Sequence, residues 1–209
     1  SLETIGNAAF HGTDITGTLT VPDKVKSIGV NAFRGITELT GLDLSGATSL
    51  ETIGNEAFRG TDITGTLTVP DKVKSIGDYA FYGITELTGL DLSGATSLET
   101  IGDYAFRFTD ITGTLTVPDK VKSIGDYAFR GTKLTGLDLS GATSLETIGT
   151  YAFYGTDITG TLTVPDKVKS IGDYAFRGTK LTGLDLSGAT SLETIGDYAF
   201  GHTELTGLD

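Results

Sequence analysis

Cysteine, methionine and tryptophan are absent from this chain of 209 residues, and histidine occurs only twice. The absence of cysteine excludes disulfides, thiolate metal sites and thiol nucleophiles. The two histidines, His11 and His202, fall near opposite ends of the sequence. We therefore expect no metal site, no cofactor and no histidine-based catalysis.

Long apolar runs and an excess of basic residues are missing as well. No stretch approaches the roughly 20 apolar residues of a membrane-spanning helix, so no membrane insertion is expected. The first residues lack the charged and apolar regions of a secretory signal peptide. The formal net charge is −12, and a chain this acidic repels nucleic acid, which is not expected as a partner.

Glycine is abundant, with 30 residues, because the sequence is an internal repeat with many turns. The hexapeptide Ile-Gly-x-x-Ala-Phe recurs about every 24 residues, beginning at Ile5, Ile28, Ile53, Ile76, Ile101, Ile124, Ile148, Ile171 and Ile195. Two kinds of unit alternate, so the full period is about 47 residues. Residues 1–209 are therefore predicted to form a single solenoid of nine alternating units, with no second domain.

Each unit contains a short segment of alternating apolar and polar residues, such as Leu-Asp-Leu at 137–139, which is typical of a half-buried strand. Units of this length that run in the same direction predict one parallel sheet, with irregular or short helical corners. In the corner hexapeptide, Ile, Ala and Phe are expected to point inward, and Gly to supply free backbone angles. The nine predicted strands centre on Leu19, Leu42, Leu67, Leu90, Leu115, Leu137, Leu162, Leu184 and Leu208.

These motifs resemble the BspA-like leucine-rich-repeat family over the whole chain. The strand motif Leu-x-x-Leu-x-Leu and the corner motif Val-Pro-Asp-x-Val-x-x-Ile-Gly-Asp-Tyr-Ala-Phe carry the resemblance. It implies a leucine-rich-repeat solenoid, an extracellular or cell-surface location, and a scaffold that binds proteins or other cells. Members of the family often carry cysteine where this chain has Thr13, Thr61, Thr132, Thr156 and Thr179.

Carboxylates and hydroxyls are numerous but are not grouped for catalysis. Asp43, Asp91, Asp138 and Asp185 recur on every second unit, so coils that each rise about 4.8 Å would place them about 9.6 Å apart. No serine has a neighbouring histidine to activate it. We expect a non-enzymatic protein.

The units are more alike than core packing requires, since cores tolerate many volume-conserving substitutions. Recent duplication and deliberate design would each produce such similarity. The alternative to an adhesive scaffold is therefore a designed or consensus structural repeat protein with no natural ligand. Ice binding by Thr-x-Thr pairs is a third hypothesis, but Gly41, Asp43 and their equivalents interrupt the threonine array on alternate units.

Acidic and basic residues alternate two positions before each corner isoleucine, in the series Glu3, Lys26, Glu51, Lys74, Glu99, Lys122, Glu146, Lys169 and Glu193. Opposite charges on adjacent coils attract, whereas a slip by one coil would set like charges side by side. The series is predicted to stabilise one register.

Tyrosine and arginine recur in the corner and form the candidate partner-binding face, because these residue types dominate protein interfaces. The candidate residues are Tyr79, Tyr104, Tyr127, Tyr151, Tyr174, Tyr198, Arg107 and Arg130. In the alternative interpretation, the tyrosine rings cover the core and the arginines pair with Asp78, Asp103, Asp126 or Asp173.

The sequence opens and closes partway through a unit and shows no obvious polar cap. An uncapped solenoid exposes apolar residues and a strand edge. We expect either head-to-tail self-association or further residues beyond this segment in a longer parent protein.

Overall fold

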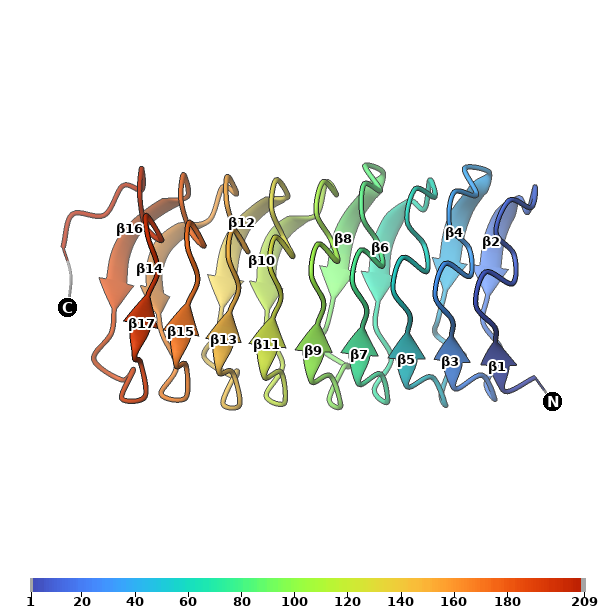
Figure 1. The fold of residues 1–209 in the computed structure, drawn as a ribbon, viewed down its shortest axis with the longest axis horizontal. Coiled ribbons are helices and arrows are strands. Elements are labelled where there is room, and N and C mark those ends of the chain that lie inside the picture. Colours follow the sequence, from blue (N-terminus) through green and yellow to red (C-terminus); the bar gives the residue numbers. More distant parts are fainter. Residues whose placement is uncertain (1, 208–209) are drawn as a thin grey trace.

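A computed structural model describes residues 2–207 and shows coils that stack along one axis, with the N-terminal and C-terminal coils at opposite ends (Figure 1). Neighbouring strands in every sheet are parallel. The predicted leucine-rich-repeat solenoid is confirmed. The described residues contain no helix, so the short helical corners that the sequence suggested are instead turns.

One continuous sheet of nine two-residue strands runs the length of the solenoid. Each strand is a Thr-Ile or Ser-Ile pair just before a corner glycine, and the isoleucines of successive coils are direct partners, as in Ile53 and Ile76. The strands are β1 (Thr4–Ile5), β3 (Ser27–Ile28), β5 (Thr52–Ile53), β7 (Ser75–Ile76), β9 (Thr100–Ile101), β11 (Ser123–Ile124), β13 (Thr147–Ile148), β15 (Ser170–Ile171) and β17 (Thr194–Ile195).

The leucine-containing segments form longer strands, but these pair only in twos: β2 with β4, β6 with β8, β10 with β12 and β14 with β16. The prediction that they form the nine-stranded sheet is therefore wrong, and Leu208 lies outside the described residues. Their bounds are β2 (Gly17–Thr20), β4 (Leu39–Asp43), β6 (Gly65–Thr68), β8 (Leu87–Asp91), β10 (Thr112–Thr116), β12 (Lys133–Asp138), β14 (Thr159–Thr163) and β16 (Lys180–Asp185).

A left-handed glycine places a bulge inside each of these pairs. Gly65, at the start of β6, has a φ of 77°, and the register with β8 shifts between Gly65 and Thr66. A glycine in this conformation introduces a bulge and bends the strand. The bend recurs in every first-type unit, at Gly17, Gly113 and Gly160.

The corner glycine of Ile-Gly has a different role from the one predicted. Gly102 does not have a positive φ, but a Cβ atom there would lie 2.6 Å from the backbone carbon of Gly77 in the preceding coil. Glycine is needed because the coils approach too closely for a side chain. The left-handed angle falls instead two residues later, on Tyr104.

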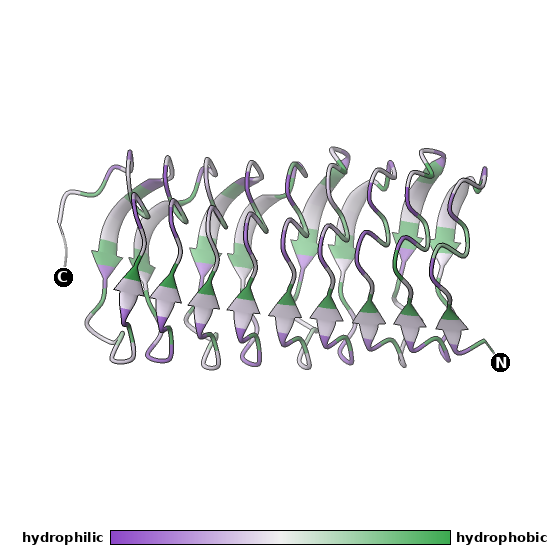
Figure 2. Cartoon of the chain, viewed as in Figure 1, coloured by the Kyte–Doolittle hydropathy of each residue, from purple (hydrophilic) through white to green (hydrophobic). Residues whose placement is uncertain are grey.

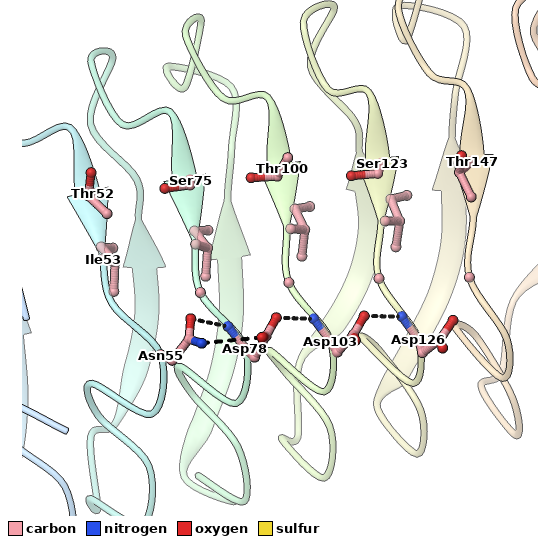
Figure 3. Close-up of a pocket in the computed structure, with 17 residues that line it drawn as sticks. Thr52, Ile53, Asn55, Ser75, Asp78, Thr100, Asp103, Ser123, Asp126 and Thr147 are labelled. Atoms are coloured by element: carbon pink, nitrogen blue, oxygen red, sulfur yellow. Dashed lines mark hydrogen bonds between the residues drawn. The ribbon is translucent and has the colours of Figure 1, made fainter. Parts of the chain in front are cut away.

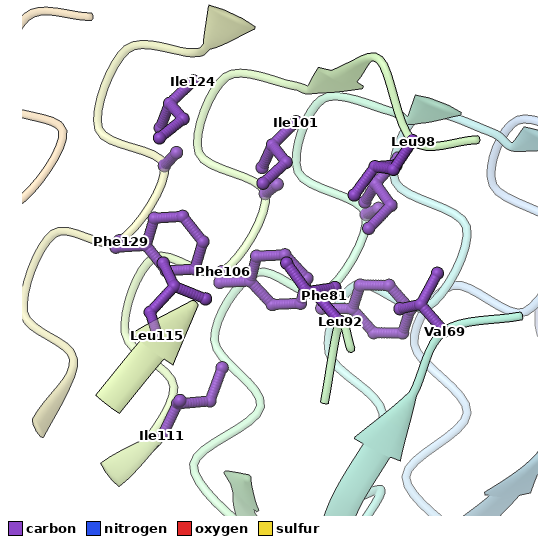
Figure 4. Packing of buried hydrophobic residues seen from close by; sticks show 14 of the residues in the cluster. Val69, Phe81, Leu92, Leu98, Ile101, Phe106, Ile111, Leu115, Ile124 and Phe129 are labelled. Carbon is purple, nitrogen blue, oxygen red and sulfur yellow. The ribbon is translucent and has the colours of Figure 1, made fainter. Parts of the chain in front are cut away.

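Phenylalanine rings fill the centre of the inner coils, as predicted, and Figure 4 shows Phe81, Phe106 and Phe129 among the packed side chains. Phe106 and Phe129 are fully buried, and their stacked rings have centroids 5.3 Å apart. The same stacking runs from Phe10 to Phe200. Hydrophobic residues accordingly recur at the same place in successive coils (Figure 2). Offset aromatic stacks add to the burial of apolar area, so each coil depends on its neighbours for its stability.

Buried threonines close the corner behind five of the phenylalanines. The Thr132 hydroxyl donates a 2.9 Å hydrogen bond to the carbonyl oxygen of Phe129, three residues earlier. Thr61, Thr109, Thr156 and Thr179 make the same bond. A buried hydroxyl is stable only when it is hydrogen-bonded, and this bond satisfies that need at the position where the resembling family often has cysteine.

Candidate functional site

The backbone of the corner projects the tyrosines of the candidate face outward. Tyr104 has a φ of 58°, and its N–H donates a 2.7 Å hydrogen bond to the carbonyl oxygen of Asp126 in the next coil. The N–H of Phe106 likewise bonds the next coil, at Ala128. These bonds along the solenoid axis hold each tyrosine in a left-handed conformation that bulky residues normally avoid.

The six candidate tyrosines form one continuous stack. The ring centroids of Tyr79 and Tyr104 are 4.5 Å apart, those of Tyr104 and Tyr127 are 4.6 Å apart, and both pairs are nearly parallel. The stack continues through Tyr151 and Tyr174 to Tyr198. Burial raises the pKa of the Tyr104 phenol. The inner rings are half-buried, whereas Tyr198 is 65% exposed at the end of the column.

Arginines pack over these rings. The Arg130 guanidinium carbon lies 5.4 Å from the ring centroids of both Tyr127 and Tyr151, and 5.0 Å from that of Tyr154. Such cation–π contacts hold the guanidinium in place while leaving its edge able to donate hydrogen bonds. The structure therefore brings together all of the candidate tyrosines with Arg107 and Arg130.

The alternative in which arginines pair with aspartates is wrong: no such ion pair occurs within residues 2–207. The aspartate carboxylates instead accept hydrogen bonds from backbone N–H groups. Asp78 accepts a 2.9 Å hydrogen bond from the N–H of Asp103, and Asp103 accepts one of 2.7 Å from the N–H of Asp126 (Figure 3). Asp173 bonds Asp197 in the same way. The aspartates link successive coils and are not counterions of the arginines.

A shallow groove runs beside this aspartate row and is lined by the hydroxyls of Thr52, Ser75, Thr100, Ser123 and Thr147 (Figure 3). Burial raises the pKa of Asp103, and the charges of Asp126 and Asp78 act in the same direction, against the hydrogen bond from the Asp126 N–H. The groove residues lie on the nine-stranded sheet and its edge, and the Asn55, Asp78, Asp103 and Asp126 side chains among them link successive coils.

Sequence reasoning missed one residue of the face, Phe108. Seven units carry glycine at this position, whereas Phe108 has a φ of 60° and is 42% exposed. The Arg107 guanidinium carbon lies 4.3 Å from its ring centroid, and Tyr82 contacts it edge-on at 5.9 Å. The departure from glycine in the repeat was a visible signal, but it did not show that the ring is exposed.

The alternating charge series resolves into discrete pairs. Lys26, Lys74, Lys122 and Lys169 each bind the glutamate of the preceding coil, at 2.8, 2.7, 2.6 and 2.6 Å. The hydrogen bond from Lys74, followed by its charge, lowers the pKa of Glu51. These exposed pairs favour the observed register and lie outside the tyrosine column.

The remaining polar candidates have local partners. Asp43 accepts hydrogen bonds from the backbone N–H and hydroxyl of Ser45, which lower its pKa, and Asp91, Asp138 and Asp185 accept equivalent backbone bonds. His11 contacts the carbonyl oxygen of Arg34 at 3.1 Å in the first coils, far along the chain from His202. Residues 2–207 contain no grouping of three or more His, Asp or Glu side chains that could hold a metal ion. Nor do they contain a helix able to cross a membrane.

A parallel solenoid whose coils carry short stacked strands and bury Leu, Ile and Phe residues is the fold of a leucine-rich-repeat protein. The family model for the BspA type leucine rich repeat region, in 6 copies, matches residues 3–135 and 99–209, so the chain belongs to this family. The predicted family resemblance is confirmed. No curated protein matches the sequence significantly.

Solved structures of bacterial leucine-rich-repeat proteins share the fold. The pneumococcal vaccine antigen PcpA is 23% identical with a TM-score of 0.69, and the match covers 100% of this chain and 56% of PcpA. A leucine rich cell surface protein from Faecalibacterium prausnitzii is 22% identical with a TM-score of 0.62, over 100% of this chain and 64% of that protein. A leucine-rich repeat protein from Bacteroides ovatus is 21% identical with a TM-score of 0.56, over 99% and 69% respectively.

Proposed function

We propose that this chain is a non-enzymatic scaffold that binds another protein, outside the cell or at a cell surface, through its tyrosine column. The observation that carries the proposal is the continuous stack of rings from Tyr79 to Tyr198 with arginines packed on it. Rigid aromatic side chains lose little conformational entropy on binding, and Tyr and Arg are the residues most often responsible for affinity at interfaces.

The extracellular location rests on the family and on the printed description of the Faecalibacterium prausnitzii protein as a cell surface protein. The solenoid itself suits a binding role because successive coils present the same side chains along one line. A partner that contacts several coils gains affinity from each of them.

The competing function is purely structural, and the geometry of the stack favours it in one respect. Each inner tyrosine is half-buried between its neighbours, so the rings also stabilise the corner. A designed or consensus array without a natural ligand would contain the same stack. Binding measurements separate the two functions, because only the scaffold function requires a partner.

The test is a binding screen of the full chain against extracellular proteins and glycans, run beside a variant with Tyr104→Asn, Tyr127→Asn and Tyr151→Asn. Asparagine is compatible with this backbone, since Asn31 occupies the same corner position with a φ of 56°. A variant with Lys72→Ser and Lys120→Ser, exposed residues outside the column, serves as the control. Protein capture by the parent and the control, but not by the asparagine variant, supports the proposal. Equal capture by all three would contradict it.

A further inference from the structure

Phe108 occupies a corner position that is glycine in seven other units and His202 in the last. Glycine at this position adopts a left-handed φ of 67–75° in seven other units, a conformation that is strained for phenylalanine. Phe108 nevertheless adopts it, with a φ of 60°, and leaves 42% of its surface exposed. This coil therefore presents an aromatic ring where seven other units carry glycine, at a backbone angle that costs phenylalanine conformational energy.

Arg107 lies at the centre of the same cluster. Its guanidinium carbon is 4.3 Å from the ring centroid of Phe108, 5.3 Å from that of Tyr104 and 5.4 Å from that of Tyr127. Its Nε atom is buried without a hydrogen-bond partner. The surrounding rings therefore orient the guanidinium without using its capacity to donate hydrogen bonds.

The charge of this cluster is not neutralised within residues 2–207. Neither Arg107 nor Arg130, one coil later, forms an ion pair there. Near the N-terminal end of the same face, by contrast, Glu56 binds Arg34 at 3.0 Å and Arg59 at 2.8 Å. In the column where Glu56 stands, the later coils carry tyrosine. The replacement of glutamate by tyrosine leaves a pair of adjacent cations on an otherwise acidic chain.

We infer that Arg107, Phe108 and Arg130 form the anchor of the binding face, and that the partner seats an acidic, extended peptide segment there. Carboxylates of the segment would accept hydrogen bonds from the two guanidinium groups, which match carboxylate geometry. An apolar side chain of the segment would cover the exposed ring of Phe108, with Tyr82 at its edge. The inference rests on the proposed function and names the chemistry of its partner.

The test sorts a displayed library of random linear peptides with the fluorescently labelled full chain. Enriched peptides are expected to carry Asp or Glu residues beside an aromatic or aliphatic residue. Their dissociation constants should rise at least about tenfold for the double variant Arg107→Gln, Arg130→Gln and for Phe108→Gly, and should rise with salt. Phe108→Gly restores the repeat consensus, so it removes the ring without threatening the fold.

The matched control is Lys72→Ser with Lys120→Ser, which removes two exposed cations outside the column and should leave peptide affinity unchanged. The inference is overturned if no peptides are enriched, if enriched peptides are not acidic, or if the anchor variants bind as well as the parent. A sulfated polysaccharide forms a separate arm of the experiment, and binding by it alone would also overturn the peptide assignment. A protein partner lost on Tyr→Asn substitution but not on Phe108→Gly would leave the scaffold function standing and refute only the anchor.

Discussion

The Lys74 ammonium donates a 2.7 Å hydrogen bond to the Glu51 carboxylate of the preceding coil, while Glu99 of the following coil is held by Lys122. Replacing Lys74 with glutamate would set three carboxylates on consecutive coils. We expect Lys74→Glu to lower the Tm at low ionic strength, with a deficit that shrinks as salt is added, because exposed charges are screened. Lys74→Gln, which removes attraction without adding repulsion, should have a smaller effect. An unchanged Tm for Lys74→Glu at low salt would show that the series does not stabilise the register.

Substitutions in the buried phenylalanine stack should destabilise the protein far more than substitutions in the charge series. Phe129 is fully buried, and its ring centroid is 5.3 Å from that of Phe106 and 5.4 Å from that of Phe153. We expect Phe129→Ala to lower the free energy of unfolding by about 3–5 kcal/mol, measured by denaturant titration. Phe10→Ala, at the 37% exposed end of the stack, should cost less. Equal costs at the two sites would mean that stacking along the column contributes little.

Because the coils approach closely at the corner glycine, a Gly→Ala substitution should cost more in an inner coil than in the first coil. Gly102→Ala would place a Cβ atom 2.6 Å from both the backbone carbon of Gly77 and a carboxylate oxygen of Asp78, whereas the equivalent atom on Gly6 meets nothing within 4 Å. Overpacking of this kind costs about 1–3 kcal/mol. Gly102→Ala should therefore reduce the free energy of unfolding by that amount and Gly6→Ala should be near neutral. Comparable losses at both positions would point to backbone angles as the reason for glycine.

Acid should weaken the lysine–glutamate pairs. Hydrogen bonds from lysine, followed by its charge, lower the pKa of Glu3, Glu51, Glu99 and Glu146 from the ordinary 4.5. The unfolded chain then binds more protons, so the stabilisation is complete above pH 4.5 and is lost as the pH falls through the lowered folded value. Asp103, whose pKa burial raises, acts in the opposite direction. Thermal melts across this range should show a shallower loss for Lys74→Gln, and identical pH profiles would contradict the assignment.

Head-to-tail association of this chain is a proposal. Exposed apolar residues at the two terminal coils favour association, whereas the charges there oppose it. Leu2 is 55% exposed at one end and Ile195 is 44% exposed at the other. Stacking would, however, bring Glu193 against Glu3, two acids where the series elsewhere alternates. We expect sedimentation to show stronger self-association for Glu193→Lys than for the parent. The parent should also associate more strongly in high salt than in low salt, because salt screens the repulsion between the two acids. No concentration dependence in either protein would refute the stacking.

The repeat motif was sufficient to predict the solenoid, the inward phenylalanines and the column of tyrosines with Arg107 and Arg130, because residues at equivalent positions of a solenoid become neighbours. The motif did not predict which of the two kinds of strand forms the continuous sheet. Both kinds of strand alternate in sequence, and the bulge at Gly65, inside the β6–β8 pair, leaves no mark in the hydrophobic pattern.

Two errors at the corner have one physical origin. Backbone strain was expected on glycine because bulky residues avoid left-handed angles, yet axial hydrogen bonds such as that from Tyr104 to Asp126 impose them on tyrosine. The arginine–aspartate pairs were expected from charge alone, yet the backbone N–H groups released by this geometry bind the Asp78 and Asp103 carboxylates. Backbone donors are satisfied before surface charges are paired.

Because the long strands pair only in twos, the solenoid has two kinds of junction between neighbouring coils. Paired strands such as β6 and β8 join a first-type coil to the coil after it, and an ion pair such as Lys74–Glu51 joins it to the coil before it. Salt would weaken the ion pairs at the second kind of junction, and pairs such as Lys133–Asp110 beside β10 and β12, but not the backbone hydrogen bonds, because only exposed charges are screened in this way. Under tension along the solenoid axis, a junction that carries paired long strands would therefore resist separation more than one that does not, although the nine-stranded sheet crosses both.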